Sequence, residues 1–200
     1  MARRIAVRQS RCTDLWHGTG TLATRDALLA LVQEEHRRNF ELWHEEDKAR
    51  APDATDAQIA AVKRSIDRLN QQRNDLIEKL DEQLRAELAA PKVRVRPGAG
   101  WNSETPGAVI DRLSILSLKI CHMREQCQRK DASPEHACRC RSRLAVLRQQ
   151  RQDLALALGE LLNDLFAGRK QMKLYRQFKM YNDPQLNPAI YGAKRAKDEG

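Results

Sequence analysis

Charged and amide side chains stand at positions that helical periodicity assigns to buried faces. At 100° per residue, Asn70 and Arg73 align with the isoleucines and leucines of one expected helix, and Arg151 interrupts a leucine stripe in another. The apolar stripe that begins with Leu28 and Val32 continues along the same helical face with polar residues. Burying a charge costs several kcal/mol unless it is paired, so these side chains must meet one another or a ligand. The polar residues that continue or edge this last stripe are His36, Asn39, Trp43, Glu46, Asp47 and Arg50.

One further helix, expected after Pro106, is apolar on one face, and its opposite face also carries the apolar Ile115 and Leu118 beside Asp111 and His122, edged by Arg112 and Lys119. A helix with two such faces is expected to lie centrally in a bundle. A histidine placed among charges can act as a general acid or base. We therefore predict His122 and Asp111 as the catalytic candidates. A hydrogen-bonded structural histidine is the alternative.

The inward set has a surplus of cations, which suits recognition of phosphate or carboxylate. The acids Glu46 and Asp47 could hold Mg²⁺, because that ion takes few carboxylates and keeps several waters. No cofactor other than Mg²⁺ is indicated. An internal salt-bridge network that fixes the helix register is the structural alternative. The predicted ligand-binding set is Arg50, Arg73, Lys119, Arg151, Asn70 and Trp43.

Two other metal motifs are weaker. The Glu-x-x-His pattern at Glu41 and His44 is typical of di-iron bundles, but it has no second copy and His44 is expected to project outward. A zinc site in a helical hairpin is the other possibility, although its spacing matches no common finger. That cluster consists of Cys121, His122, Cys127, His136, Cys138 and Cys140.

The breakers divide the chain into helices over about 24–50, 55–88, 106–130 and 134–166, with a short helix over about 170–181 and a turn-rich end. Residues 90–106 form a linker. Short connections favour antiparallel neighbours. The fold class is therefore all-α, an up-and-down antiparallel bundle of four main helices plus a C-terminal helix. We expect a basic N-terminal extension over 1–23, one helical-bundle domain over 24–191 and a polar tail over 192–200.

The net charge of +9 belongs to the two ends of the chain. Residues 1–11 hold four arginines and no acid, residues 167–200 hold eight cations and three acids, and the part between is neutral. This argues against nucleic-acid binding, which requires a basic stripe on a folded surface. Basic tails could remain solvated or touch an acidic partner. No apolar run approaches the ~20 residues of a transmembrane helix, no secretory signal is expected, and an odd five cysteines fits reduced thiols in a cytoplasm.

Several segments resemble an uncharacterised bacterial family, domain of unknown function 4254, over about residues 25–191. The matching segments are 43–50 (Trp-His-Glu-Glu-Asp-Lys-Ala-Arg), 63–71 (Lys-Arg-Ser-Ile-Asp-Arg-Leu-Asn-Gln), 102–106 (Asn-Ser-Glu-Thr-Pro), 110–116 (Ile-Asp-Arg-Leu-Ser-Ile-Leu), 118–120 with 122–123, and 179–184 with 186–188. The resemblance implies no activity, but it implies a setting near genes for cell-envelope glycans and lipopolysaccharide. It also adds Glu104 to Glu46 and Asp47 as metal-binding carboxylates, together with the turn at 182–184.

The leading prediction is a cytoplasmic bundle protein whose interhelical polar pocket binds a phosphorylated small molecule, such as a nucleotide or sugar phosphate, in cell-envelope glycan synthesis. One alternative is a non-catalytic partner protein that has a buried ionic network and docks a glycosyltransferase or other protein. Another is a Mg²⁺-dependent nucleotide hydrolase. A catalytic pocket requires Arg73, Asp111 and His122 to converge at an open site, whereas the partner alternative requires them to be paired without a cavity.

Overall fold

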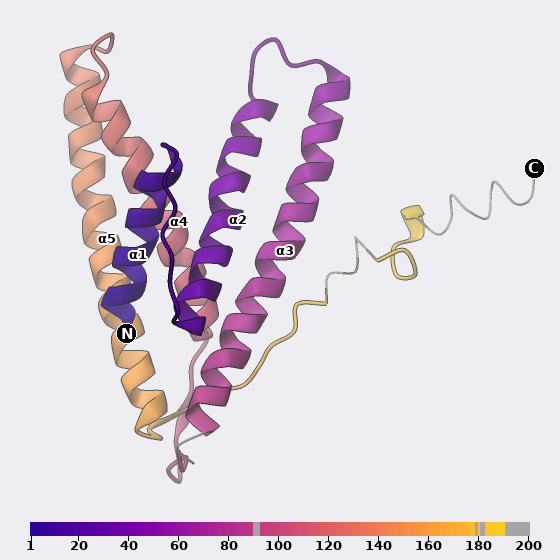
Figure 1. Cartoon of the computed structure of the whole chain (residues 1–200), viewed down its shortest axis with the longest axis vertical. Helices are drawn as coiled ribbons and strands as arrows, with labels where there is room; N and C mark the ends of the chain where they lie inside the picture. The colour runs from indigo at the N-terminus through magenta and orange to yellow at the C-terminus, as the bar shows by residue number, and fades with distance from the viewer. Residues whose placement is uncertain (90–92, 179, 181–182, 191–200) are drawn as a thin grey trace, which may run out of the picture.

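The computed structural model describes residues 1–89, 93–178, 180 and 183–190, and up to residue 178 this part of the chain forms five helices and one pair of two-residue strands. The all-α, up-and-down bundle is confirmed. Figure 1 shows α2 beside α3 and α4 beside α5, with the two pairs diverging toward the loops that join each pair. The elements are α1 (Ala2–Trp16), α2 (Ala27–Ala49), α3 (Asp56–Ala89), β1 (Gly100–Trp101), α4 (Pro106–Gln128), α5 (Pro134–Phe166) and β2 (Lys170–Gln171).

The helices begin where short polar side chains and prolines favour a start. Asp26 accepts a hydrogen bond from the Leu29 backbone N–H at 3.1 Å, and Thr105 accepts one from Ala108 at 3.2 Å. Ser133 caps α5 in the same way, and Pro106 and Pro134 each open their helix. An N-cap side chain satisfies a backbone donor that the helix leaves free, and proline at the first position loses no bond.

The two hairpins meet closely at the start of α4. A Cβ on Gly107 would lie 2.7 Å from the Ile77 carbonyl oxygen, so glycine allows α4 to approach α3. The Gly107 backbone N–H donates to Asp81 Oδ1 at 2.7 Å. Burial raises the pKa of Asp81 to about 6. The main core lies around this junction and includes Leu80, Leu84, Ile110, Leu113 and Leu158.

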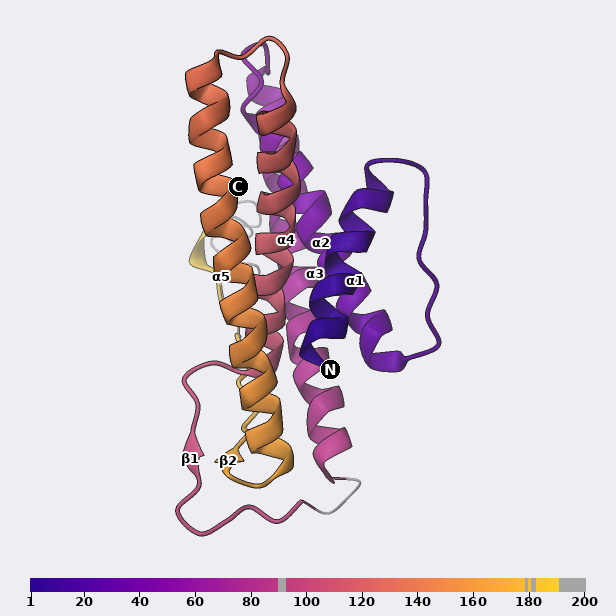
Figure 2. The ribbon, with the colours of Figure 1, turned by 90° about the vertical axis from the view of Figure 1, so that its left-hand side faces the viewer.

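Helix α1 packs one face against α2, α4 and α5, so a solvated extension was the wrong expectation for residues 2–16. Ile5 and Cys12 are fully buried, and they share a helical face with Gln9. Arginines on the outer face fasten the segment 17–26, which runs back along α1 in Figure 2. Arg4 pairs with Asp26 at 3.1 Å, and Arg8 donates to the Leu22 carbonyl at 2.8 Å. These terminal cations therefore serve internal contacts.

After α5 the chain does not form the helix expected over 170–181. Lys170 and Gln171 pair in parallel with β1, and residues 172–178 are not helical; 179, 181 and 182 lie outside the described residues. The physical reason is that Arg176 binds Glu78 and Glu82 of α3, at 2.7 and 2.6 Å, in place of local contacts. No helix in the described chain is long and apolar enough to cross a membrane.

Candidate functional site

A hollow of about 790 Å³ opens between α2, α4 and α5, and we call it the α2–α4–α5 hollow. Four of the residues selected from the sequence line it, two from α2 and two from α4. Apolar side chains of α4 and α5 form much of its wall, and Arg143 lies at its α5 side. The four selected residues are Trp43, Asp47, Lys119 and His122; the apolar ones include Met123, Val146 and Leu147.

Two stacked aromatic rings and two cations line this hollow. The Trp43 and His122 rings stack with centroids 4.6 Å apart and planes 10° from parallel. Lys119 and Arg143 form no ion pair with any residue in the described part of the chain. Unpaired cations beside an apolar, aromatic wall suit a ligand that has a flat body and a negative charge.

Three histidines from three helices meet beside this hollow, and we call them the histidine triad. His17 is the C-cap residue of α1, His44 lies on α2 and His122 on α4. Their ring centroids are 5.0 Å (His17–His122), 5.4 Å (His17–His44) and 5.6 Å (His44–His122) apart. Burial and the two neighbouring histidines lower the pKa of His44. The expectation that His44 projects outward is wrong, because α1 covers that side of α2.

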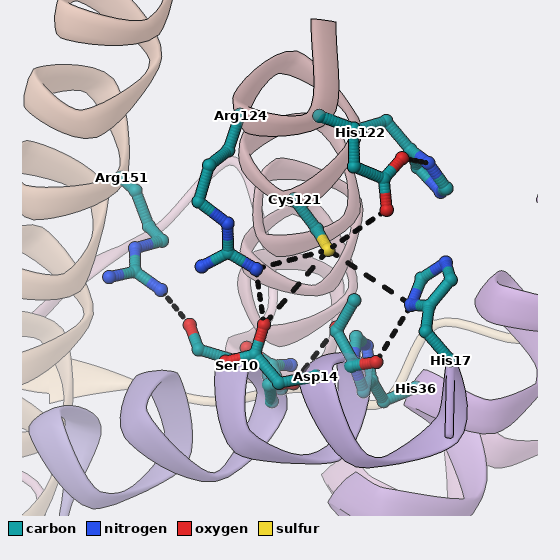
Figure 3. Close-up of polar contacts among 11 residues, drawn as sticks. Ser10, Asp14, His17, His36, Cys121, His122, Arg124 and Arg151 are labelled. Atoms are coloured by element: carbon teal, nitrogen blue, oxygen red, sulfur yellow. Dashed lines mark hydrogen bonds and ion pairs between the residues drawn. The ribbon is translucent and has the colours of Figure 1, made fainter. Parts of the chain in front are cut away.

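Hydrogen bonds already hold two of the triad rings. His122 Nδ1 lies 2.9 Å from a Glu125 carboxylate oxygen, and His17 Nδ1 lies 2.9 Å from the Thr13 carbonyl oxygen. Figure 3 shows both rings on the same side of Cys121, whose sulfur lies 4.0 Å from His17 Nδ1 and from Glu125. Burial, followed by the Glu125 charge, raises the pKa of the Cys121 thiol. The thiol is therefore protonated at neutral pH and is a poor resting nucleophile.

A fourth histidine, His36, lies in a closed chain of hydrogen bonds that we call the His36 relay. Asn39 Nδ2 donates to Ser114 Oγ at 3.0 Å, and Ser114 Oγ lies 2.7 Å from His36 Nδ1. On the other side, His36 Nε2 lies 2.8 Å from Thr13 Oγ1, which donates to the Gln9 carbonyl. Because Thr13 gives its proton to Gln9, it must accept from His36, which fixes the proton on Nε2. Burial lowers the pKa of His36 to about 3, so this ring stays neutral.

Two buried carboxyl groups, Glu35 and Asp111, adjoin the relay. Asn39 Nδ2 lies within hydrogen-bond distance of both, so that its two hydrogens are shared among three acceptors including Ser114. It is 2.8 Å from Asp111 Oδ1, and Arg73 Nε lies 3.5 Å from the same Asp111 oxygen. Burial, followed by the neighbouring Asp111 charge, raises the pKa of Glu35 well above its ordinary value. Burial thus favours the neutral form of Glu35, which lies beside the Arg73–Asp111 ion pair.

The structure separates residues that the sequence grouped together. Asp111 and His122 lie eleven positions apart on α4, roughly 16 Å at 1.5 Å per residue, so they do not act on one atom. Arg73 joins Asp111 in the buried cluster and not in the α2–α4–α5 hollow. Asn70 is half-buried on α3.

The three carboxylates proposed for Mg²⁺ are also apart. Glu104 precedes α4 and pairs with Arg112 at 2.6 Å, whereas Asp47 faces residues 119–126 of that helix, at least roughly 20 Å further along. Glu46 pairs with Arg50 on the surface of α2 at 2.7 Å. Arg50 and Arg112 are exposed, contrary to their expected inward positions.

Arg151 lines a different hollow, of about 720 Å³, between α1, α4 and α5, where it donates to Ser10 of α1 (Figure 3). The zinc cluster expected in the hairpin is divided as well. Cys140 Sγ lies 3.3 Å from His136 Nε2 on α5, while Cys121 and His122 face α1 and α2. The cysteines and histidines expected to form one zinc site therefore lie in two places: Cys140 and His136 pair on α5, whereas Cys121 and His122 lie against α1 and α2.

The sequence prediction missed three residues of these polar clusters: Glu35, Ser114 and His17. A signal existed for Glu35, which follows Val32 by three positions and precedes Asn39 by four, on the same stripe. Ser114 follows Asp111 by three positions in the same way. No comparable signal marked His17, because its place depends on how α1 docks.

Comparison with known proteins gives one family. The model of the family described as "Protein of unknown function (DUF4254)" matches residues 29–174, which include α2 to α5 and exclude α1. No curated protein and no solved structure matches the chain. The resemblance seen in the sequence is thereby confirmed: the chain belongs to the DUF4254 family of proteins of unknown function.

Proposed function

We propose that this protein binds a nucleotide-like anion, a ligand with a flat ring and a phosphate group, in the α2–α4–α5 hollow. The observation that carries the proposal is the convergence of Trp43, Asp47, Lys119 and His122 on one hollow, although each was selected from helical periodicity alone. Ligand sites in helical bundles form between facing helices, with apolar walls and a few placed polar groups.

The groups that line the hollow can each bind one portion of such a ligand. The indole of Trp43 and the wall of Met123 and Val146 offer a surface for a base. Lys119 and Arg143 offer charge for phosphate, and Asp47 can accept hydrogen bonds from sugar hydroxyls. Nucleotide sugars combine all three features. They also fit the envelope-glycan setting that the family resemblance implies, so we propose them as the class to test first.

The proposal is one of binding, with His122 as the proton carrier for any reaction. Asp47 is the one predicted metal-binding carboxylate at the hollow, so the separation of Glu46 and Glu104 weighs against the Mg²⁺-dependent hydrolase. For the catalytic prediction, the distance between Asp111 and His122 leaves His122 without its expected partner.

A non-catalytic partner protein is the second candidate, and one observation favours it. Arg73 and Asp111 are paired inside the bundle, as a buried network that fixes helix register requires. The α2–α4–α5 hollow is not explained by that role. The two candidates therefore differ in one property, the binding of a small anion.

A thermal-shift screen of the full chain tests the proposal against nucleotides, nucleotide sugars and sugar phosphates, with and without Mg²⁺ and with no transition metal added. A ligand at 100 times its dissociation constant stabilises the fold by about 2.7 kcal/mol. We expect Arg143→Ala and Lys119→Ala to abolish the shift. Arg141→Ala, an exposed arginine on the same helix outside the hollow, should retain it. A screen in which no anion raises the melting temperature would contradict the proposal and favour the partner protein.

A further inference from the structure

The histidine triad offers one ring nitrogen from each of three helices to a common point. One nitrogen from each of His17, His44 and His122 lies within 4.8 Å of the other two. In a tetrahedral zinc site, metal–nitrogen bonds of about 2.0–2.1 Å place the nitrogens roughly 3.3 Å apart. Metal binding therefore requires the three rings to move closer together.

Nδ1 of two of the rings is fixed in the way that one nitrogen of a metal-binding histidine is usually fixed. His17 Nδ1 can only donate to the Thr13 carbonyl, since a carbonyl oxygen has no proton to give. His122 Nδ1 lies 2.9 Å from a carboxylate oxygen of Glu125. A ligating histidine characteristically donates its other ring N–H to a carboxylate or backbone carbonyl, which sets the tautomer and the ring orientation. Nε2 of both rings is thereby left with its lone pair.

The other ring nitrogen of His122 lacks a hydrogen-bond partner among the described residues. This nitrogen, Nε2, is buried. Buried polar atoms nearly always have a partner, and an exception requires an explanation such as an ion. In His36, by contrast, both ring nitrogens are bonded.

We propose that His17, His44 and His122 form a binding site for a divalent transition metal of the Zn²⁺ class. Imidazole nitrogens suit zinc and its neighbours and do not suit Mg²⁺. Three protein ligands leave a fourth position for water or a ligand, as in zinc sites that are not purely structural. Glu125 and Cys121, which with His17 form a second group of close ligand atoms, stand on the flank of the site.

The site is distinct from the proposed anion site, although His122 belongs to both. Its support is the arrangement of the triad and does not depend on the ligand of the hollow. A metal held by His122 would lie at the edge of the α2–α4–α5 hollow, where an anionic group could reach the fourth position.

The test is zinc binding by the metal-free full chain, measured by titration calorimetry and by metal content after dialysis. We expect one zinc per chain, and an affinity loss in His17→Gln and His44→Gln of more than about 100-fold, beyond what loss of an outer-shell partner costs. His136→Gln is the matched control, because His136 lies on α5 beside Cys140 and outside the triad. Circular dichroism and melting of each metal-free variant check that the fold is kept.

Three outcomes would overturn the proposal. They are no stoichiometric zinc, unchanged zinc binding in His17→Gln and His44→Gln, and zinc lost in His136→Gln, which would place the metal at the α4–α5 hairpin. Failure here leaves the anion screen unaffected, because that screen uses no transition metal. Failure of the anion screen likewise leaves the zinc result intact.

Discussion

The His36 relay and the histidine triad are built from the same three helices and have opposite properties. Moving eight residues along α2 leads from His36 to His44, and moving eight along α4 leads from Ser114 to His122, about 12 Å in each case. In the relay, each ring nitrogen of the histidine has a protein partner. In the triad, His122 keeps a buried nitrogen with no partner in the described chain.

The difference teaches which polar interior belongs to the fold and which to a ligand. A buried ring that is bonded at both nitrogens contributes rigidity and a unique register, whereas removal of the ring leaves its partners unpaired at high cost. An unsatisfied but pre-oriented group costs stability in the free protein and is useful only when something binds it. The relay should therefore respond to changes in stability, and the triad to changes in ligand.

The largest expected effect is the acid sensitivity of the relay. Because burial lowers the pKa of His36 from 6.5 to about 3, its contribution to stability is complete above pH 6.5 and is lost as the pH falls toward 3. At about 1.4 kcal/mol per pKa unit, the free energy of unfolding should fall by roughly 3 kcal/mol between pH 7 and 4 through this group alone.

Urea unfolding of the wild type and His36→Gln at several pH values isolates this contribution. The two pH profiles should differ in slope below pH 6.5, and His136→Gln should follow the wild type. Parallel profiles for the wild type and His36→Gln would show that His36 titrates freely, and the relay would not be closed.

The second expected effect is the loss of the shared donor. Asn39→Ala leaves Asp111, Ser114 and Glu35 without their shared amide, so the free energy of unfolding at pH 7 should fall by about 2 kcal/mol. Asn163→Ala, an exposed asparagine of α5, is the control and should change it by less than about 0.5 kcal/mol. A loss of similar size in both variants would contradict a special role for the relay.

Much of the fold could be predicted because its signals are local. Asp26, Thr105 and Pro134 mark helix starts by their own backbone and side-chain chemistry, and they do so in the structure. Helix α1 was not predicted because its buried face has few large apolar side chains. Its arginines instead suggested a tail. Those arginines act through Asp26 and Leu22, contacts that no local pattern reveals.

The site was predictable in part for the same reason. Periodicity selected Trp43, Asp47, Lys119 and His122 because these residues share helical faces, which depend on sequence alone. Periodicity could not show that Asp111 and His122 are far apart, because two residues on one helical face can be separated by several turns. It also assigned His44 to solvent, because a helix covered on two sides buries more than one stripe, and the docking of α1 is a tertiary event.

The smallest expected effect concerns Glu125, whose carboxylate lies beside His122 Nδ1. Glu125→Gln weakens the acceptor for His122 Nδ1, so zinc affinity should fall about 10- to 100-fold while the unfolding free energy without metal barely changes. Glu135→Gln, an exposed glutamate at the start of α5, should bind zinc as the wild type does. An unchanged affinity in Glu125→Gln would mean that this carboxylate does not orient the ring.

The central claim, that one histidine is committed to the fold and three are held for a metal, is tested most directly by the imidazole ¹⁵N resonances of the five histidines. Spectra are recorded between pH 5 and 8, before and after one equivalent of Zn²⁺. His36 should remain neutral with its proton on Nε2 throughout, and His136 should ignore the metal. His17, His44 and His122 should shift together on zinc addition. A titrating His36, or a triad that zinc leaves unchanged, would contradict the account.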